Sequence, residues 1–129
     1  MDDVFVSQLM STTMYTVSPD TLVEEAAQVL LDNDIGSVVV TDGDDEVAGI
    51  LTTTDFVEIV AKSQPKAQTR VSRYMTTDVL TTSPGTPITD VAETLEAEGF
   101  HHMPVVDETN ALTGMITTSD LAAYLSHLR

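Results

Sequence analysis

The sequence predicts an α/β protein made of two copies of one small unit, each a short sheet with two packed helices. Three observations predict this fold class. Residues 6–64 align without a gap with residues 71–129, and 16 of the 59 aligned pairs are identical. Each copy contains two stretches whose apolar residues recur at the spacing of a helix face. Each copy also contains two short apolar runs rich in β-branched residues, which are typical of strands. An internal duplication explains the pattern.

The first half of each copy is expected to be a helical turn, an extended segment and a helix. The helical turns are placed near residues 7–10 and 72–75, and the extended segments at 14–17 and 79–82. Ser18-Pro19-Asp20-Thr21 has the composition of a turn and supplies a cap for the helix that follows, with Glu24 and Glu25 in its first turn. One buried helix face is expected from Val23, Ala26, Ala27, Val29, Leu30 and Leu31, and in the second copy from Ile88, Val91, Ala92 and Leu95.

The second half of each copy is expected to be a hairpin followed by a helix. Residues 35–41 and 47–52 have the pattern of two strands, and the acidic stretch 42–45 has the composition of a hairpin turn. We expect the final helix to follow Asp55, and its counterpart to follow Asp120. The repeats are placed at residues 4–62 and 71–129, with a polar linker at 63–70. Two such units, each with one apolar sheet face, are expected to pack about a pseudo-twofold axis.

Charge limits the classes of partner. The chain has 21 Asp and Glu against 5 Lys and Arg, which gives a net charge of −16. Nucleic acids and anionic membranes need a basic surface, so both are disfavoured as partners. An acidic surface on an ordinary core indicates a halophilic protein, because molar salt shortens the Debye length to about 3 Å and screens the repulsion. An acidic protein from a low-salt cytoplasm is the alternative.

Several kinds of site and location are disfavoured by composition. The absence of cysteine excludes disulfides, thiol nucleophiles and zinc–thiolate sites. The three histidines show no metal-binding spacing, and the acidic turn at 42–46 lacks the closing glutamate of a calcium loop, so no metal is expected. No G-x-S-x-G elbow is present, and we expect no enzyme. The acidic start of the chain and the lack of a long apolar run predict a cytoplasmic protein.

One stretch carries the functional signal because it occurs twice. Residues 49–55 read Gly-Ile-Leu-Thr-Thr-Thr-Asp, and residues 114–120 read Gly-Met-Ile-Thr-Thr-Ser-Asp. We interpret each stretch as a strand that passes directly into a helix, where free N–H groups attract an anion. Its hydroxyls can donate to phosphate, and its carboxylate can accept from a diol. The alternative is that Thr54, Asp55, Ser119 and Asp120 only cap helices. The repetition favours a ligand site.

These residues resemble cystathionine-β-synthase (CBS) domains in tandem, a pair often called a Bateman module. The resemblance rests on the element order, the Ser-Pro-x-Thr turns, the stretch Gly-Phe-His-His-Met-Pro-Val-Val-Asp at 99–107 and the repeated Thr-x-[Thr/Ser]-Asp ending. It covers about residues 4–129. The first copy departs from the pattern, because Val39 stands where the second has Pro104 and it lacks the histidine pair.

The resemblance implies two clefts between the repeats that bind adenosine nucleotides or related adenosyl ligands. In one cleft the implied site residues are Ile50, Thr52, Thr54 and Asp55 of the first repeat, facing Leu80, His101 and His102 of the second. In the other cleft they are Met115, Thr117, Ser119 and Asp120 of the second repeat, facing Tyr15, Gly36 and Ser37 of the first. One histidine of the pair is a candidate phosphate donor, with plain structural polarity as the alternative.

We therefore expect a stand-alone regulatory module without catalytic activity. The regulatory ligand would be an adenine nucleotide, with AMP favoured over ADP, ATP and S-adenosylmethionine, and the bound state would pass to an effector protein. The final helices, 56–60 and 121–125, carry apolar residues that a second copy can cover, which predicts a homodimer. The alternative is a dimerisation or interaction module with empty clefts, favoured by the lack of a Lys or Arg next to either Asp.

Overall fold

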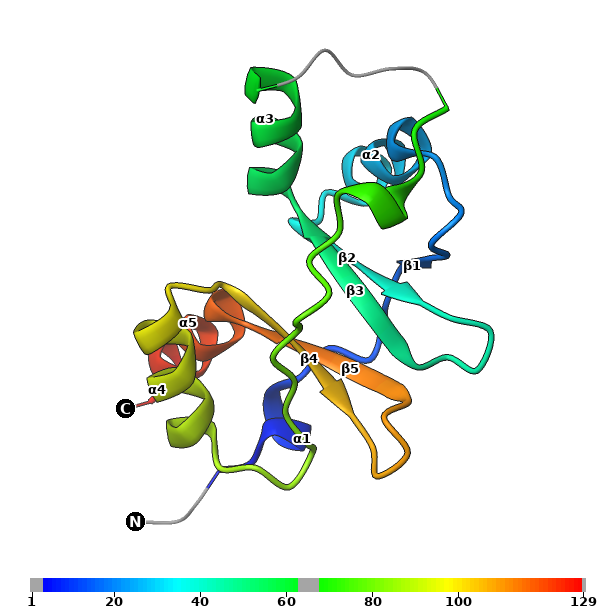
Figure 1. Ribbon diagram of the computed structural model, residues 1–129. Coiled ribbons are helices and arrows are strands. Elements are labelled where there is room, and N and C mark those ends of the chain that lie inside the picture. Colours follow the sequence, from blue (N-terminus) through cyan, green and yellow to red (C-terminus); the bar gives the residue numbers. More distant parts are fainter. Residues whose placement is uncertain (1–3, 63–67, 129) are drawn as a thin grey trace. The chain divides into compact units, whose positions relative to one another are not determined.

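The computed structural model describes residues 4–62 and 68–128, which form two compact units (Figure 1). We call residues 15–62 and 68–79 the first-repeat unit, and residues 4–14 and 80–128 the second-repeat unit. The elements are α1 (Val6–Leu9), β1 (Thr16–Val17), α2 (Val23–Asn33), β2 (Ser37–Thr41), β3 (Val47–Thr52), α3 (Thr53–Lys62), the 3-10 helix η1 (Val71–Arg73), α4 (Ile88–Glu98), β4 (His102–Val106), β5 (Leu112–Thr117) and α5 (Thr118–Ser126). The expected α/β class is confirmed.

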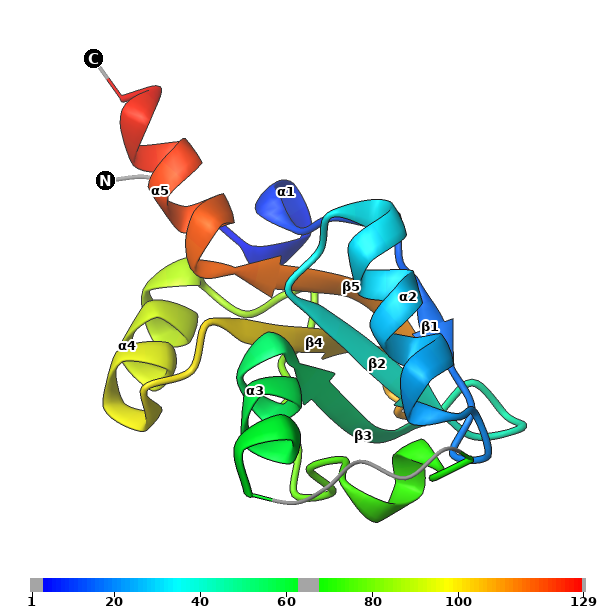
Figure 2. The ribbon, with the colours of Figure 1, turned by 90° about the horizontal axis from the view of Figure 1, so that it is seen from above.

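The first-repeat unit is built on a three-stranded sheet. Its order is β1-β2-β3, with β1 parallel to β2 and β3 antiparallel to β2. Helix α2 packs against β2 and helix α3 continues directly from β3 (Figure 2). The core is formed by buried aliphatic side chains from α2, the sheet and η1: Val17, Ala26, Leu30, Val38, Val40, Leu51 and Val71.

The second-repeat unit repeats this plan with a two-stranded sheet. Strands β4 and β5 are antiparallel, and α1, α4 and α5 pack with them. Its core consists of Val6, Ile88, Val91, Leu95, Met103, Val105 and Ile116.

The compact units exchange their leading segments relative to the repeats. Val6 of α1 is fully buried in the core of the second-repeat unit, and its N–H donates to the Thr86 carbonyl at 2.9 Å. Val71 of η1 is fully buried in the core of the first-repeat unit, and its N–H donates to the Thr21 carbonyl at 2.8 Å. The first-repeat unit therefore contains the helical turn η1 of the second repeat. The second-repeat unit contains the helical turn α1 of the first repeat. Of the expected linker 63–70, only 68–70 lies within the described residues.

A proline accounts for the different strand numbers of the two sheets. Thr16 pairs with Val39 in a parallel ladder, and that pairing needs the Val39 N–H as a donor. The equivalent residue, Pro104, has no N–H, although its carbonyl still accepts from Thr82 at 3.0 Å. The second-repeat unit consequently has one isolated bridge, from Thr82 to Val105, where the first has strand β1.

Three local expectations are wrong. Leu31 is 75% exposed and does not belong to the buried face of α2, and Ala92 is exposed on α4. Thr21 does not cap α2, because its hydroxyl oxygen accepts from the Ser18 N–H within the turn and the helix begins after Leu22. Strand β2 begins at Ser37, two residues later than expected. The periodic pattern locates a helix face but does not fix its edges.

Candidate functional site

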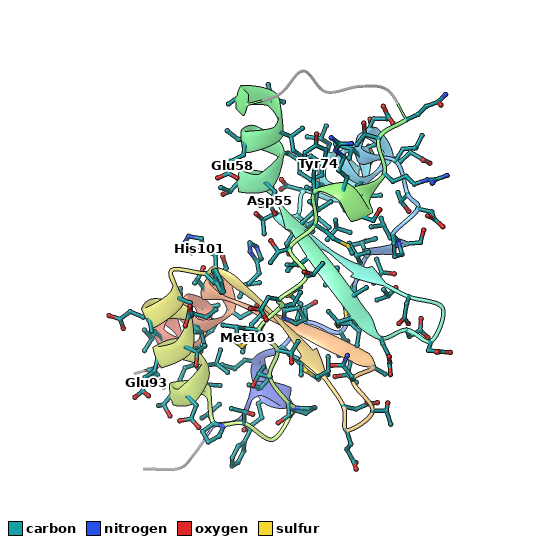
Figure 3. All side chains as sticks on the ribbon, viewed as in Figure 1. Asp55, Glu58, Tyr74, Glu93, His101 and Met103 are labelled. Carbon is teal, nitrogen blue, oxygen red and sulfur yellow. The ribbon has the colours of Figure 1, made fainter. Side chains whose placement is uncertain are left out.

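The β3–α3 junction of the first-repeat unit is closed by a reciprocal pair of hydrogen bonds. The Thr52 N–H donates to Asp55 Oδ2 at 2.8 Å, and the Asp55 N–H donates to Thr52 Oγ1 at 3.4 Å. The Thr52 hydroxyl also donates to Asp55 Oδ2 at 3.2 Å. This arrangement is a capping box, which satisfies donors at the start of a helix and fixes the carboxylate. Asp55 lies at the strand end of α3 (Figure 3).

The β5–α5 junction of the second-repeat unit has the same geometry. The Thr117 N–H donates to Asp120 Oδ2 at 2.9 Å, and the Asp120 N–H donates to Thr117 Oγ1 at 3.2 Å. Within the described residues, neither Asp55 nor Asp120 has a hydrogen bond to Oδ1. One carboxylate oxygen of each Asp therefore holds the helix start.

The position of the helix starts corrects the sequence expectation. Helix α3 begins at Thr53 and α5 at Thr118, so each Asp lies in the first turn and not before it. Thr117 is the N-cap of α5, and Thr52 makes the equivalent bonds in α3. Asp55 and Asp120 are therefore the third residues of their helices, where a carboxylate also benefits from the helix dipole.

The strand that pairs with each junction begins beside it. In the first-repeat unit Ser37 pairs with Thr52, and the Thr53 N–H donates to the Gly36 carbonyl at 3.1 Å. In the second-repeat unit His102 pairs with Thr117, and the Thr118 N–H donates to the His101 carbonyl at 3.0 Å. The first N–H of each helix is thus already satisfied, which leaves fewer free donors for an anion than the sequence suggests. Ser37 is 7% exposed, whereas His101 is exposed.

Four further expected site residues lie on the edges of these sheets. Tyr15 precedes β1 and is 41% exposed, and Leu80 occupies the equivalent position at 39%. The backbone N–H and carbonyl of Ile50 exchange two hydrogen bonds with those of Thr76, at 3.0 Å each. Met115 and Ser11 exchange the same pair of backbone hydrogen bonds, at 2.9 Å each. The backbone groups of both residues are therefore already paired, while the Ile50 side chain is 9% exposed and the Met115 side chain is half-buried.

Each compact unit contains seven of the expected site residues. Ile50, Thr52, Thr54, Asp55, Tyr15, Gly36 and Ser37 belong to the first-repeat unit, and Leu80, His101, His102, Met115, Thr117, Ser119 and Asp120 to the second. The expected clefts pair residues of one unit with residues of the other. That pairing stays a prediction.

Among the residues at these junctions, His102 has a shifted pKa. Burial lowers the pKa of His102 below its usual value, the neighbouring His101 lowers it further, and Asp120 raises it in part. His102 is therefore neutral at pH 7, and a neutral imidazole can donate one hydrogen bond to a phosphate oxygen without carrying charge.

Sequence reasoning missed a contact that supports each junction. A Cβ on Gly114 would lie 2.7 Å from Met10 Sδ and 3.0 Å from the Ser11 carbonyl oxygen, so a larger residue at this position would press on the segment that pairs with β5. Gly49 and Met75 make the equivalent contact in the first-repeat unit. The recurrence of this glycine and this methionine at the 65-residue offset was the available signal. The contact fixes the segment that pairs with Met115.

Within residues 4–62 and 68–128, no three His, Asp or Glu side chains are grouped so that they could hold a metal ion. None of the helices in this part of the chain has the length and apolar character needed to cross a membrane.

The CBS domain model matches the chain twice, at residues 6–62 and 71–127. This chain belongs to the CBS domain family. It is a tandem CBS pair, because the two matches follow each other along the chain and together cover most of it. The resemblance seen in the repeated Thr-x-[Thr/Ser]-Asp motif is confirmed.

Two curated relatives show the range of proteins in which such a pair occurs. An uncharacterized 17.7 kDa protein of Acidianus ambivalens is 35% identical over 120 residues, which are 93% of this chain and 72% of the relative. A homoserine O-acetyltransferase of Methanosalsum zhilinae is 28% identical over 129 residues, the whole of this CBS pair but 25% of the enzyme. The chain therefore corresponds to a quarter of that enzyme.

Two solved structures share the fold. The CBS domain pair of protein MJ0100, in complex with 5'-methylthioadenosine and S-adenosyl-L-methionine, has a TM-score of 0.90 at 22% identity, covering 97% of this chain and 98% of that one. CBSX2 in complex with AMP has a TM-score of 0.83 at 24% identity, covering 97% and 98%. At these identities the likeness shows the fold.

Proposed function

We propose that this CBS pair is a regulatory module that binds an adenosyl nucleotide, AMP in the first place, and signals the bound state to an effector protein. The observation that carries the proposal is the pair of junctions at Asp55 and Asp120. Each presents a carboxylate whose Oδ2 is fixed by a capping box and whose Oδ1 has no hydrogen bond within the described residues. A carboxylate held in this way is preorganised to accept from the hydroxyls of a ribose.

The surroundings of each Asp supply donors suited to phosphate. Thr54 and Ser119 are exposed on the first turns of α3 and α5, where hydroxyl groups and the helix dipole favour an anion. In the cleft that we propose, the His101 and His102 side chains face Asp55, while Gly36 and Ser37 face Asp120. The two clefts would therefore differ, and the histidine-containing cleft is the better phosphate site.

The similar CBS pairs support this choice of ligand. MJ0100 and CBSX2 were crystallised with ligands that share an adenosyl group and differ in what the ribose carries. In this chain no lysine or arginine flanks either Asp in sequence, so the site offers few charges to a triphosphate. AMP, with one phosphate, suits this composition better than ATP.

Identification of the ligand tests the proposal. The purified protein would be denatured and the released small molecules identified by mass spectrometry, followed by calorimetric titration with AMP, ADP, ATP and S-adenosylmethionine. We expect a 5'-adenosyl compound to co-purify or to bind with micromolar affinity. Failure of all four compounds to bind the ligand-free protein at molar salt would contradict it.

A second candidate function, dimerisation, is favoured by the helices that follow the junctions. Val57 and Val60 on α3 are 65% and 70% exposed, and Leu125 on α5 is 66% exposed. In the second-repeat unit a groove of about 430 Å³ lies along α4 and α5, lined mainly by apolar side chains such as Phe100 and Leu121. A second copy covering these faces would form an isologous dimer. Such a dimer is compatible with nucleotide binding, or is the whole function if the clefts are empty.

A further inference from the structure

The basic residues of this chain are concentrated in one short segment. Four of the five, Lys62, Lys66, Arg70 and Arg73, lie within residues 62–73, and that segment contains no acidic residue. The rest of the chain has 21 acidic residues and one arginine, which is a charge of −20. A positive segment on such an acidic sequence background offers an anionic partner attraction at short range.

The described end of this segment is held firmly by the first-repeat unit. Val71 is fully buried, and its N–H donates to the Thr21 carbonyl at 2.8 Å. The Val23 N–H donates to the Thr69 carbonyl at 2.8 Å, and the Ser72 N–H to the Pro19 carbonyl at 3.1 Å. The backbone of residues 69–72 is therefore anchored on the turn before α2 and on the first residue of that helix, and this anchoring fixes where the side chains of these residues begin.

Both arginines on this anchored turn are exposed, and each makes only a weak interaction with the rest of the unit. Arg70 Nε lies 3.9 Å from Asp20 Oδ1, and the two side chains are 66% and 86% exposed, so their ion pair contributes little. The Arg73 guanidinium lies 5.9 Å from the centre of the Tyr74 ring. A guanidinium stacked on a ring keeps its N–H donors directed outward. Tyr74 lies beside η1 in Figure 3.

We propose that Arg70, Arg73 and Tyr74, which we call the arginine turn, form a docking surface for an acidic segment of a partner protein. Each guanidinium can bind a carboxylate with two parallel hydrogen bonds, and Tyr74 orients one of them. A short acidic segment fits because it brings few charges close to the −16 chain. A nucleic acid or an anionic membrane extends over many charges and meets the repulsion of the whole surface.

This inference rests on the proposed regulatory function in one respect, because it takes the partner to be the effector protein. The arginine turn is the surface that the effector protein would contact. The surface lies on η1 and on the residues directly before and after it, and its chemistry does not involve Asp55 or Asp120. Its test therefore uses no nucleotide. A CBS pair that binds AMP and not the acidic probe, or the reverse, separates the two proposals.

The probe is a fluorescein-labelled peptide of four glutamates, followed by fluorescence anisotropy at about 0.15 M salt, where the Debye length of about 8 Å screens the more distant acidic residues. We expect the parent to bind it, with affinity falling as salt rises, and Arg70→Gln/Arg73→Gln to bind about tenfold more weakly or worse. The control, Thr89→Glu/Ala97→Glu, changes the net charge by the same −2 at exposed positions on α4 and should weaken binding by roughly twofold or less. Thermal unfolding verifies that each variant is folded, and Arg73→Gln alone serves if the double variant is not.

Three results would overturn the proposal. The first is a parent protein that does not bind the peptide at this salt concentration. The second is an equal loss in the arginine variant and in the charge-matched control, which would show that net charge alone governs binding. The third is tighter binding of an oligothymidylate or of vesicles containing phosphatidylserine, with the same dependence on Arg70 and Arg73, which would assign the turn to another class of partner.

Discussion

Met75 lies so close to Gly49 that a Cβ on residue 49 would be 2.7 Å from Met75 Sδ and 2.9 Å from the Thr76 carbonyl oxygen. The contact places the segment after η1 directly on β3, where Thr76 exchanges two hydrogen bonds with Ile50. One of the two close atoms belongs to a flexible side chain and the other to the backbone. The side chain can move away from an added methyl group, but the carbonyl cannot move without breaking the bridge.

We therefore predict that Gly49→Ala destabilises the protein by about 1–3 kcal/mol, as overpacking of a well-filled site does. The matched control is Gly43→Ala, because a Cβ on Gly43 meets nothing within 4 Å. It should stay within about 0.5 kcal/mol of the parent. The measurement is chemical denaturation at fixed salt. Adding Met75→Ala to Gly49→Ala should restore only part of the loss, since the Thr76 oxygen remains; full restoration would show that the thioether alone is responsible.

The sequence predicts the elements of each unit well, for reasons visible in particular residues. Residues 47–52 are predicted as a strand and β3 covers the same residues, because a turn ends on one side and a hydroxyl cluster begins on the other. The predicted start of α3, after Asp55, is wrong because the helix begins at Thr53. Thr53 and Thr54 suit a strand, a cap or a first helical turn equally well, so the sequence does not locate this boundary.

The exchange of leading segments could not be predicted from the repeat. A shift of 65 residues aligns Val6 with Val71 whether each packs on its own copy or on the other, so the alignment carries no information about the choice. The same ambiguity applies to the candidate site. Motif position predicts that Thr52 and Asp55 lie together, but not which residues face them from the other repeat.

His102 predicts a pH dependence of stability. Burial and His101 lower its pKa in the folded protein below the usual 6.5, so the unfolded chain takes up the proton first as pH falls. The contribution of His102 to the free energy of unfolding is therefore lost from about pH 6.5 downward and levels off below its folded pKa. Denaturation between about pH 7.5 and 5.5 should show a shallower slope in His102→Gln than in the parent. A slope in His102→Gln equal to that of the parent would refute the assignment.

The apolar surface of α3 predicts self-association that depends on salt. At molar salt the repulsion between chains of −16 is screened, and we expect light scattering to show a dimer at micromolar concentration. Val57→Ser/Val60→Ser should shift the protein toward monomer without a large loss of stability, because both side chains are mostly exposed. Glu58→Gln on the same helix is the control and should remain dimeric (Figure 3). A parent that is monomeric at molar salt would exclude the dimer.

Calorimetric titration of AMP into Asp55→Asn and Asp120→Asn, compared with the parent at molar salt, tests the ligand site most directly. Asn keeps an oxygen that can accept the Thr52 or Thr117 N–H, so the capping box and the fold should be retained, while the charge that accepts from a ribose is lost. We predict that at least one variant binds AMP about tenfold more weakly or worse, at 1.4 kcal/mol per factor of ten. Asp107→Asn, in the exposed β4–β5 turn, should bind as the parent does. If both junction variants bind AMP as tightly as the parent, the two aspartates only cap their helices and the nucleotide site proposed here is contradicted.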